Sequence, residues 1–497
     1  SLQYEMIYTN VLNMLDLAGI PLFAKDRGEA MPFVVGGGPC VYNVEPIADF
    51  FDFFIVGEGE EAIVEVSDAF MAWKREGRLG GRKGFLQRLL DVPGIYVPSF
   101  YEPEYDEEGN YRALRPLVEA AKPVIYKRVI RDMDDAISVE HPVVPYMDIV
   151  HNRIMLELFR GCSRGCRFCQ AGICYRPARE RTEENLRKMA RGLVDATGYD
   201  EMSLTSLSSA DYSCLGRLVD DLMADFRDEK VSFSLPSLRI DSFSIDLAHK
   251  MQQVRKSGLT FAPEAGTQRL RDVINKQVTE DDLFGAVDAA FGAGWRRCKL
   301  YFMIGLPTET DDDIKGIASL VQRAYDRAKK AVPVEQRGNI RMSVSCALFV
   351  PKAQTPFQWD GQIAPEEALR RVSLLRRSVK YRAIDVHWHD PSTSFVEAVM
   401  SRGGRAAAAW VESAWRHGAR FDAWTEHFNE QAWRDAAEEV GLDPAAVAQT
   451  SYDTGYVMPW EHISTGVSTR FLAHERKKAA AEKTTPDCTF ERCAACG

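Results

Sequence analysis

The chain has 497 residues, of which 45% are hydrophobic and 27% charged, so it has the composition of a folded globular protein. At the usual size of about 100–200 residues per domain, this length corresponds to roughly three domains. The net charge of −10 argues against a protein that coats nucleic acid by charge alone, but it leaves room for a local basic site. A run of about 18 uncharged apolar residues is absent from the sequence, so we predict no membrane span.

The eleven cysteines are unevenly spread along the chain. Six of them form two clusters, namely Cys162, Cys166 and Cys169 in the middle of the chain and Cys488, Cys493 and Cys496 at its end. Clustered cysteines in a large chain without a signal peptide indicate metal ligation in a reducing compartment, so we predict a cytoplasmic protein. The other five cysteines are predicted to be buried small apolar residues.

Both ends of the sequence interrupt a pattern. The first residue, Ser1, leads without a methionine into a strand end and an apolar helix. The last residue, Gly497, directly follows a cysteine of the terminal cluster. We therefore expect the chain to be a fragment at both ends.

Segments with strand and helix patterns alternate in the first part of the chain. A helical pattern covers residues 11–17, and residues 32–39 and 49–66 each read as a strand that runs into a glycine turn. This alternation predicts part of a Rossmann-like α/β domain over residues 1–115. Residues 116–150 are irregular and contain repeated prolines, which predicts a linker.

A second series of strands and helices predicts a partial parallel (β/α)6 TIM-like barrel over residues 151–360. The six strands are expected at residues 153–159, 201–206, 231–235, 259–263, 298–304 and 341–349. In such a barrel the functional residues lie at the carboxyl ends of the strands. Residues 361–480 carry helical periodicity and no strand pattern, so we predict a helical extension, followed by a cysteine-rich tail over residues 481–497.

The decisive segment is LELFRGCSRGCRFCQAG, residues 156–172, in which a strand leads into a glycine-rich loop. The loop carries Cys162, Cys166 and Cys169 with three and two residues between them. Three thiolates are one short of the four that bind a fully ligated [4Fe–4S] cluster, so one iron would stay open for a substrate or cofactor. A structural zinc site closes all four positions and would need further cysteines downstream.

This segment, with the aromatic Phe168 directly before the third cysteine and a barrel pattern behind it, resembles the radical S-adenosylmethionine superfamily. The resemblance implies a [4Fe–4S] cluster whose open iron binds S-adenosylmethionine. It implies cleavage of that cofactor to a 5′-deoxyadenosyl radical, with Phe168 near the adenine. It also implies a reductant such as flavodoxin or ferredoxin as a partner. The cofactors would perform the difficult chemistry, and the protein would position them and exclude water.

Further residues match the pattern of this superfamily at successive strand ends. Ser206 and Ser208 lie in the turn after the second strand, where the family contacts the methionine amino group, although the usual glycine pair and glutamate are absent. Ser237 and Arg239 follow the third strand, and the arginine is expected to pair with the methionine carboxylate. Glu264 follows the fourth strand and is expected to accept hydrogen bonds from the ribose. The resemblance implies no identity for the catalytic residues.

For two further cofactor sites the sequence allows two alternatives each. Residues 34–61 resemble the second half of the cobalamin-binding domain that often precedes such barrels, but the upstream DxHxxG motif is absent. Cobalamin binding and a Rossmann-like domain kept for packing or substrate docking therefore both remain. The terminal cysteines Cys488, Cys493 and Cys496 are predicted to hold a second metal, either iron–sulfur or zinc, and the alternative is unligated thiols.

The turn at residues 203–212 is similar to that of the methylthiotransferases, which favours methylation or methylthiolation of RNA, protein or a small molecule. The cysteine loop is followed by three arginines, Arg176, Arg179 and Arg181. We predict that they lie at a solvated helix start among glutamates; the alternative is that they contact an anionic substrate. The alternative function is a non-catalytic zinc- or RNA-binding protein with structural cysteine sites.

Overall fold

The computed structural model describes residues 1–107, 110–147, 149–235, 240, 259–488 and 493–496. A small sheet lies in the N-terminal part, with strand order β1-β2-β3; β1 and β2 are parallel and β3 is antiparallel to β2. Its strands and the helices around them are β1 (Val35–Gly36), β2 (Phe53–Ile55), β3 (Ile95–Tyr96), α1 (Tyr8–Leu17), α2 (Ala62–Arg75) and α3 (Gly81–Leu89). The predicted helix at residues 11–17 is thus present and begins three residues earlier.

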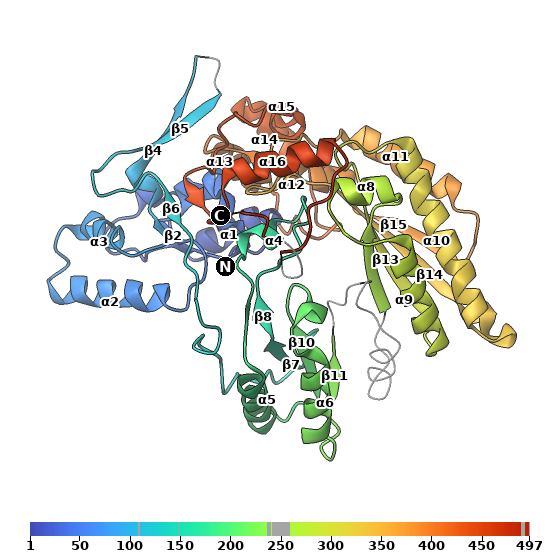
Figure 1. The fold of residues 1–497 in the computed structure, drawn as a ribbon. Helices are drawn as coiled ribbons and strands as arrows, with labels where there is room; N and C mark the ends of the chain where they lie inside the picture. The colour runs from blue at the N-terminus through green and yellow to red at the C-terminus, as the bar shows by residue number, and fades with distance from the viewer. Residues whose placement is uncertain (108–109, 148, 236–239, 241–258, 489–492, 497) are drawn as a thin grey trace.

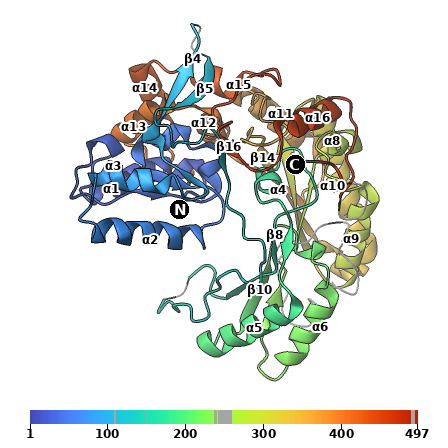
Figure 2. The ribbon, with the colours of Figure 1, turned by 60° about the vertical axis from the view of Figure 1, so that its left-hand side comes forward.

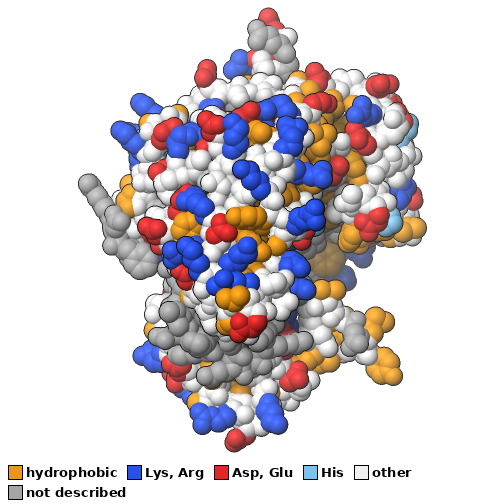
Figure 3. Space-filling model, turned by 90° about the vertical axis from the view of Figure 1, so that its right-hand side faces the viewer, with side chains coloured by type: hydrophobic (Ala, Val, Ile, Leu, Met, Phe, Trp, Pro, Cys, Tyr) orange, Lys and Arg blue, Asp and Glu red, His pale blue; other side chains and the backbone are white. Residues whose placement is uncertain are grey.

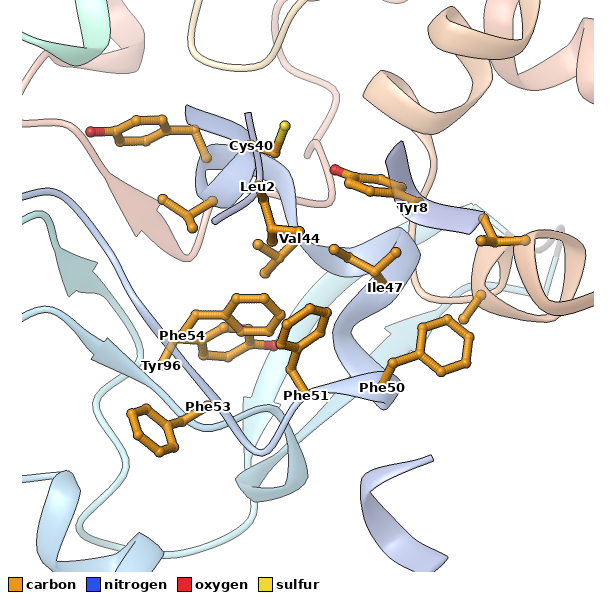
Figure 4. Close-up of a cluster of buried hydrophobic side chains, with 14 of the residues drawn as sticks. Leu2, Tyr8, Cys40, Val44, Ile47, Phe50, Phe51, Phe53, Phe54 and Tyr96 are labelled. Atoms are coloured by element: carbon orange, nitrogen blue, oxygen red, sulfur yellow. The ribbon is translucent and has the colours of Figure 1, made fainter. Parts of the chain in front are cut away.

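Aromatic side chains fill the core of this N-terminal part. Phe53 and Phe54 from β2 and Tyr96 from β3 are all at most 1% exposed, and Figure 4 shows them beside Phe50 and Phe51. Such rings bury large apolar areas, so a sheet with very short strands still has a dense core. Cys40 lies in the same cluster as a buried thiol, as predicted for an isolated cysteine.

The predicted barrel strands form two parallel sheets, β11-β10-β7 and β12-β13-β14-β15. Their bounds are β7 (Ile154–Glu157), β10 (Glu201–Thr205), β11 (Ser232–Ser234), β12 (Leu259–Glu264), β13 (Arg297–Ile304), β14 (Arg341–Leu348) and β15 (Ile384–Trp388). A short antiparallel pair, β8 (Phe159–Arg160) and β9 (Arg179–Glu180), follows β7. All six predicted strands are therefore confirmed within about three residues at each end. The parallel sheets and the mixed α/β architecture confirm the predicted fold class.

Helices lie between the strands of these sheets along the chain, and the longer ones flank the sheets (Figure 1). They are α4 (Gln170–Cys174), α5 (Glu183–Thr197), α6 (Leu215–Asp225), α8 (Gln268–Val273), α9 (Glu280–Gly292), α10 (Asp311–Ala331) and α11 (Pro365–Ser378). Thr182 and Thr279 cap α5 and α9, because each threonine side chain accepts a bond from a free backbone N–H of the first turn.

The prediction of helices without strands beyond residue 361 is wrong at β15. In this strand Ile384, Val386 and Trp388 alternate with polar residues, and the strand extends the second sheet beside β14. The alternation with a period of two is the normal signature of a strand, but the segment is too short to stand out between two helices. The remaining elements of this region are α12 (Pro391–Arg402), α13 (Ala407–Arg416), α14 (Glu430–Val440), α15 (Pro444–Gln449), β16 (Ile463–Ser464) and α16 (Thr469–Ala480).

The C-terminal region packs against the N-terminal one. Helices α13 and α14 share a hydrophobic core with α1 and β2, and the two views show the red-orange helices against the blue elements (Figure 1 and Figure 2). The segment between the two predicted domains is also pinned. The hairpin β4 (Tyr101–Tyr105) and β5 (Tyr111–Pro116) precedes it, and its strand β6 (Ile125–Tyr126) pairs in parallel with β16. These pairings join parts of the chain that are far apart in sequence.

The surface carries both signs of charge. On the face shown in Figure 3, Lys and Arg side chains alternate with Asp and Glu, with hydrophobic side chains between them. Arg370 on α11 is typical, because it pairs with Asp311 and with Glu367. Among the described helices none is long and apolar enough to cross a membrane.

Candidate functional site

Two cavities flank the cysteine loop, and Cys162 borders both. The first, here called the barrel cavity, has a volume of about 340 Å³. It is lined from the cysteine loop by Cys162, Arg164, Cys166, Phe168, Cys169 and Gly172, and from the barrel by Leu207, Ser208, Ile240, Thr260, Ala262, Glu264, Lys276, Val278 and Tyr301. The second, the tail cavity, has a volume of about 760 Å³ and lies between the cysteine loop, residues 126–131 and the C-terminal tail.

The barrel cavity receives alternate side chains of β12. Thr260, Ala262 and Glu264 line it, whereas Leu259 and Phe261 are buried in the core beneath the helices. This alternation follows from the strand period of two, which sends successive side chains to opposite faces. Polar residues at the carboxyl end of this strand therefore meet the cysteine loop, as the barrel pattern predicts.

The cysteine loop turns sharply at its start. Gly161 has a φ of +90°, and a Cβ there would lie 2.5 Å from the Pro177 carbonyl oxygen and 2.7 Å from that of Tyr175. At the other end, the Cys169 thiol caps α4 by accepting a bond of 3.3 Å from the Gly172 N–H. Burial raises the pKa of the Cys169 thiol to about 12, and the neighbouring Cys166 adds to the shift. This thiol therefore needs a cation or a metal to become a thiolate at neutral pH.

A Gly161→Ala variant should test the tight packing of the loop start. The new methyl group would clash with two carbonyl oxygens at a φ that disfavours side chains, so we expect the free energy of unfolding to fall by about 2 kcal/mol or more. Gly192→Ala is the matched control, because Gly192 lies inside α5 with no atom within 4 Å of the new methyl group. That control should gain roughly 0.5–1 kcal/mol from helix propensity. Urea denaturation measures both, and equal effects would contradict the packing argument.

Arg167 lies between the second and third cysteines, and its buried side chain holds the loop in place. Its side chain is fully buried and forms an ion pair with Glu475 of α16. It also donates to the carbonyl oxygens of Val273 at 2.8 Å and Lys483 at 2.7 Å. An arginine that satisfies all of its donors inside the protein fixes the backbone on both sides of it.

The serine turn after β10 presents one hydroxyl to the barrel cavity. Ser206 lies within the turn, where its Oγ donates to Ser209 Oγ at 3.1 Å and accepts from the Ser208 N–H at 3.2 Å. Ser208 lines the cavity, and its buried Oγ has no hydrogen-bond partner among the described residues. A buried hydroxyl without a partner costs free energy, so this atom is suited to meet a ligand.

Glu264 lies at the end of β12 in an unusual backbone conformation. Its φ is +67°, and the pairing of β12 with β13 is irregular between Phe261 and Glu264. Its carboxylate accepts a bond of 3.1 Å from Lys276, which lines the same cavity. Left-handed conformations of residues other than glycine cost about 1 kcal/mol or more and are enriched at functional sites.

The structure thus brings six of the predicted residues to one cavity: Cys162, Cys166, Phe168, Cys169, Ser208 and Glu264. Ser206 supports the turn and does not line the cavity. Ser237 and Arg239 lie outside the described residues. The sequence reasoning missed Lys276 and Tyr301. Lys276 is the last residue of the segment FAPEAGTQRLRDVINK, residues 261–276, which begins with the strand end that carries Glu264. Its place in that segment is the sequence signal that could have identified it.

The terminal cysteines lie on the tail side of the cysteine loop. Cys488 and Cys496 line the tail cavity together with Cys162, while Cys493 is exposed and its Sγ accepts from the Ala495 N–H at 3.4 Å. In the described part of the chain, no three His, Cys, Asp or Glu side chains are close enough together to hold a metal ion as they stand. All eleven cysteines lie within the described residues, and none of them forms a disulfide.

The three arginines that follow the cysteine loop lie in different surroundings. Arg176 lines the tail cavity. Arg179 pairs with Glu58 of the N-terminal part, and Arg181 is buried and donates to the Met133 carbonyl oxygen. The prediction that these arginines lie at a solvated helix start is therefore wrong for Arg181.

A relative among the curated proteins spans most of the chain. An uncharacterized protein from Methanocaldococcus jannaschii is 28% identical over 418 residues, which is 83% of this chain and 79% of that protein. A tRNA-2-methylthio-N(6)-dimethylallyladenosine synthase from Ehrlichia canis is 22% identical over 279 residues, which is 51% of this chain and 59% of that enzyme.

Solved structures with similar folds are distant in sequence. A radical S-adenosylmethionine methyltransferase, TsrM, from Kitasatospora setae is 12% identical, with a TM-score of 0.48 over 82% of this chain and 81% of that one. The cobalamin-dependent S-adenosylmethionine radical enzyme OxsB is 13% identical, with a TM-score of 0.44 over 96% of this chain and 74% of that one.

Family profiles match two segments that together make up more than half of the chain. Residues 1–98 match the N-terminal region of radical SAM proteins, and residues 156–321 match the radical SAM superfamily. The second match contains the cysteine loop, the serine turn and Glu264. With the cysteines at the mouth of the barrel cavity, the chain belongs to the radical SAM superfamily and is an enzyme of that class.

Proposed function

We propose that Cys162, Cys166 and Cys169 hold a [4Fe–4S] cluster and that S-adenosylmethionine binds beside it in the barrel cavity. The observation that carries this proposal is the shared lining of one cavity by the three thiols, the partnerless Ser208 hydroxyl and Glu264. A volume of about 340 Å³ lies in the range of small-molecule sites. When bound, the two cofactors supply electron transfer and a 5′-deoxyadenosyl radical, as is general for this superfamily.

The residues of this chain would orient the cofactor and shield it. Glu264 would accept bonds from the ribose hydroxyls, and Lys276 holds the Glu264 carboxylate in place from one side. Ser208 would bind the amino acid part, and the ring of Phe168 would cover the adenine. Lys276 also places a positive charge in the cavity, where it would face the carboxylate of the cofactor.

For the reaction itself, we propose modification of a substrate by methylation or methylthiolation, with RNA, protein or a small molecule as the substrate. The serine turn after β10 supports this class, and so does the partial similarity to a tRNA methylthio synthase. A reductant such as flavodoxin or ferredoxin would deliver the electron. The alternative of a non-catalytic zinc- or RNA-binding protein is disfavoured by the superfamily match.

Cobalamin binding by residues 1–115 stays a prediction. A Cβ at Gly57 would lie 2.3 Å from the Arg128 carbonyl oxygen, and one at Gly38 would lie 2.8 Å from that of Leu2. The close approach of these glycines is thus to the chain's own backbone, which supports the packing alternative.

A second metal at Cys488, Cys493 and Cys496 is also a proposal. It is supported by the position of Cys488 and Cys496 at one cavity, although the three thiols do not converge in the described structure. Iron and zinc analysis of the purified protein tests this site.

The test of the proposed function is the Cys166→Ala variant. We expect anaerobically reconstituted wild-type protein to form 5′-deoxyadenosine from S-adenosylmethionine after reduction, and Cys166→Ala to lose at least 100-fold of this rate, because a cluster with two protein ligands is not retained. Cys214→Ala is the matched control, since Cys214 lies at the start of α6 and borders neither cavity. Cleavage of the cofactor by Cys166→Ala at the rate of the control would overturn the assignment.

A further inference from the structure

The tail cavity has the size and position of a substrate site. With about 760 Å³ it is more than twice as large as the barrel cavity, and Cys162 forms part of the wall of each. A molecule in the tail cavity would therefore lie next to the cysteine loop, in a cavity that Glu264 does not line. The remaining walls come from segments that the fold brings together over long distances, namely residues 126–131, 176–178 and 464–467 with Cys488 and Cys496.

The lining of this cavity is basic although the whole chain is acidic. Lys127, Arg128, Arg131 and Arg176 line it, and none of the described lining residues is Asp or Glu. In a chain with a net charge of −10, four cations and no carboxylate among the described lining residues of one cavity are a local exception.

Two of these cations are occupied by the protein. Arg128 is paired with Glu61 and Glu65 on α2. The Lys127 ammonium donates to the carbonyl oxygens of Cys174, at 2.7 Å, and Arg176. The two carboxylates offset the charge of Arg128, whereas the neutral carbonyl oxygens fix Lys127 in the cavity wall without offsetting its charge.

The other two guanidinium groups are available. Arg131 is exposed, and no carboxylate among the described residues pairs with it. Arg176 donates through Nε to the Gly172 carbonyl oxygen at 3.0 Å and forms no ion pair in the described part of the chain. Guanidinium groups bind phosphate through two parallel hydrogen bonds, which makes them suited to phosphate esters.

The aromatic ring of Tyr126 lines the same cavity as Arg131 and Arg176. Tyr126 lines the cavity and is 67% exposed, although its neighbour Ile125 is buried. A large exposed ring next to unpaired arginines is the combination that binds nucleotides, because the base stacks on the ring while the arginines hold the phosphate.

We propose that the tail cavity binds the substrate of this enzyme, and that the substrate carries a nucleotide phosphate held by Arg131 and Arg176. This inference rests on the proposed function, because it makes the neighbour of the cysteine loop the target of the radical chemistry. The phosphate can come from a free nucleotide or from an RNA strand.

The experiment measures binding to the oxidised, cluster-loaded protein without reductant. The probe is a fluorescein-labelled ten-nucleotide oligoadenylate followed by anisotropy, with unlabelled AMP as competitor. We expect the wild type to bind the probe and Arg131→Gln and Arg176→Gln each to weaken binding at least fivefold. We also expect each variant to reduce the steepness of the salt dependence by about 0.7 per lost phosphate contact. Arg382→Gln, at an exposed arginine outside the cavity, is the matched control and should bind as the wild type does.

The arms of the experiment separate the outcomes. Displacement of the probe by AMP supports a free nucleotide, and binding of the oligonucleotide alone supports RNA. The inference is overturned if the wild type does not bind the labelled oligoadenylate, or if Arg382→Gln weakens binding as much as Arg131→Gln does. Because the assay requires no cofactor cleavage, probe binding without formation of 5′-deoxyadenosine would overturn the proposed function and not the cavity assignment.

Discussion

Replacing Arg167 with methionine is expected to lower the free energy of unfolding by about 3–5 kcal/mol. The side chain of Arg167 is fully buried and that of its partner Glu475 is 3% exposed, so the variant leaves a carboxylate buried with only part of its compensation. It also removes the donors to the carbonyl oxygens of Val273 and Lys483. Leaving several buried acceptors unpaired adds to the loss of the ion pair.

The same variant should release iron from the cysteine loop. Arg167 lies directly after Cys166, and its backbone N–H also donates to the Ile274 carbonyl oxygen. With the side-chain anchors gone, the loop samples more conformations, and the three thiols converge less often. We expect less than half of the wild-type iron content after anaerobic reconstitution, measured by colorimetric iron assay.

A matched exposed pair provides the control for this effect. Arg187 on α5 pairs with Asp225, and the two side chains are 42% and 33% exposed. Arg187→Met should cost less than 1 kcal/mol in urea denaturation, because water screens such a pair. The double variant Arg167→Met/Glu475→Leu should recover part of the lost stability, since it no longer buries a lone carboxylate. If Arg167→Met and Arg187→Met are equally stable, the anchoring argument is wrong.

The sequence predicts the local part of this site and not the long-range part. The spacing of Cys162, Cys166 and Cys169 and the strand before them are local patterns, and they were sufficient to predict the loop and its position at a strand end. The partner of Arg167 lies 308 residues away on α16, and no local pattern couples the two. The same holds for Asp487, which meets Ser163 and Arg164 of the loop.

Short elements are the other reason why the structure differs from the sequence predictions. Strand β15 has only five residues and lies between two strongly periodic helices, so its alternating pattern was outweighed. The pairing of β6 with β16 involves two residues on each strand, and only the docking of the N-terminal and C-terminal regions creates it. The segment predicted as a linker, residues 116–150, is therefore paired with the C-terminal region through β6.

A buried polar network joins those two regions and should make the stability of the protein depend on pH. Glu45 accepts a bond of 2.7 Å from the Tyr96 hydroxyl and one of 3.0 Å from Arg405 Nε. His462, before β16, lies with its Nε2 at 3.5 Å from the same carboxylate and its ring 4.8 Å from that of Tyr96. Burial lowers the pKa of His462 from its ordinary value of 6.5 to about 4, although the charge of Glu45 opposes this shift.

The sign of the dependence follows from proton uptake. Above pH 6.5 the histidine is neutral in both the folded and the unfolded chain, and it contributes no penalty. Between pH 6.5 and pH 4 the unfolded chain binds a proton at this residue and the folded chain does not, so stability falls as the pH is lowered. The loss reaches about 3 kcal/mol near pH 4 and then levels off, because the folded protein also becomes protonated.

The difference in unfolding free energy between His462→Gln and the wild type isolates this contribution. A glutamine does not titrate, so the variant should gain about 3 kcal/mol relative to the wild type between pH 7 and pH 4, whatever its stability at pH 7. His474→Gln, at an exposed position of α16, should follow the wild-type profile over the same range. Urea denaturation at half-unit pH intervals measures all three proteins. A constant difference between His462→Gln and the wild type would mean that His462 takes up its proton in the folded state, and that the Glu45 carboxylate outweighs the cost of burial.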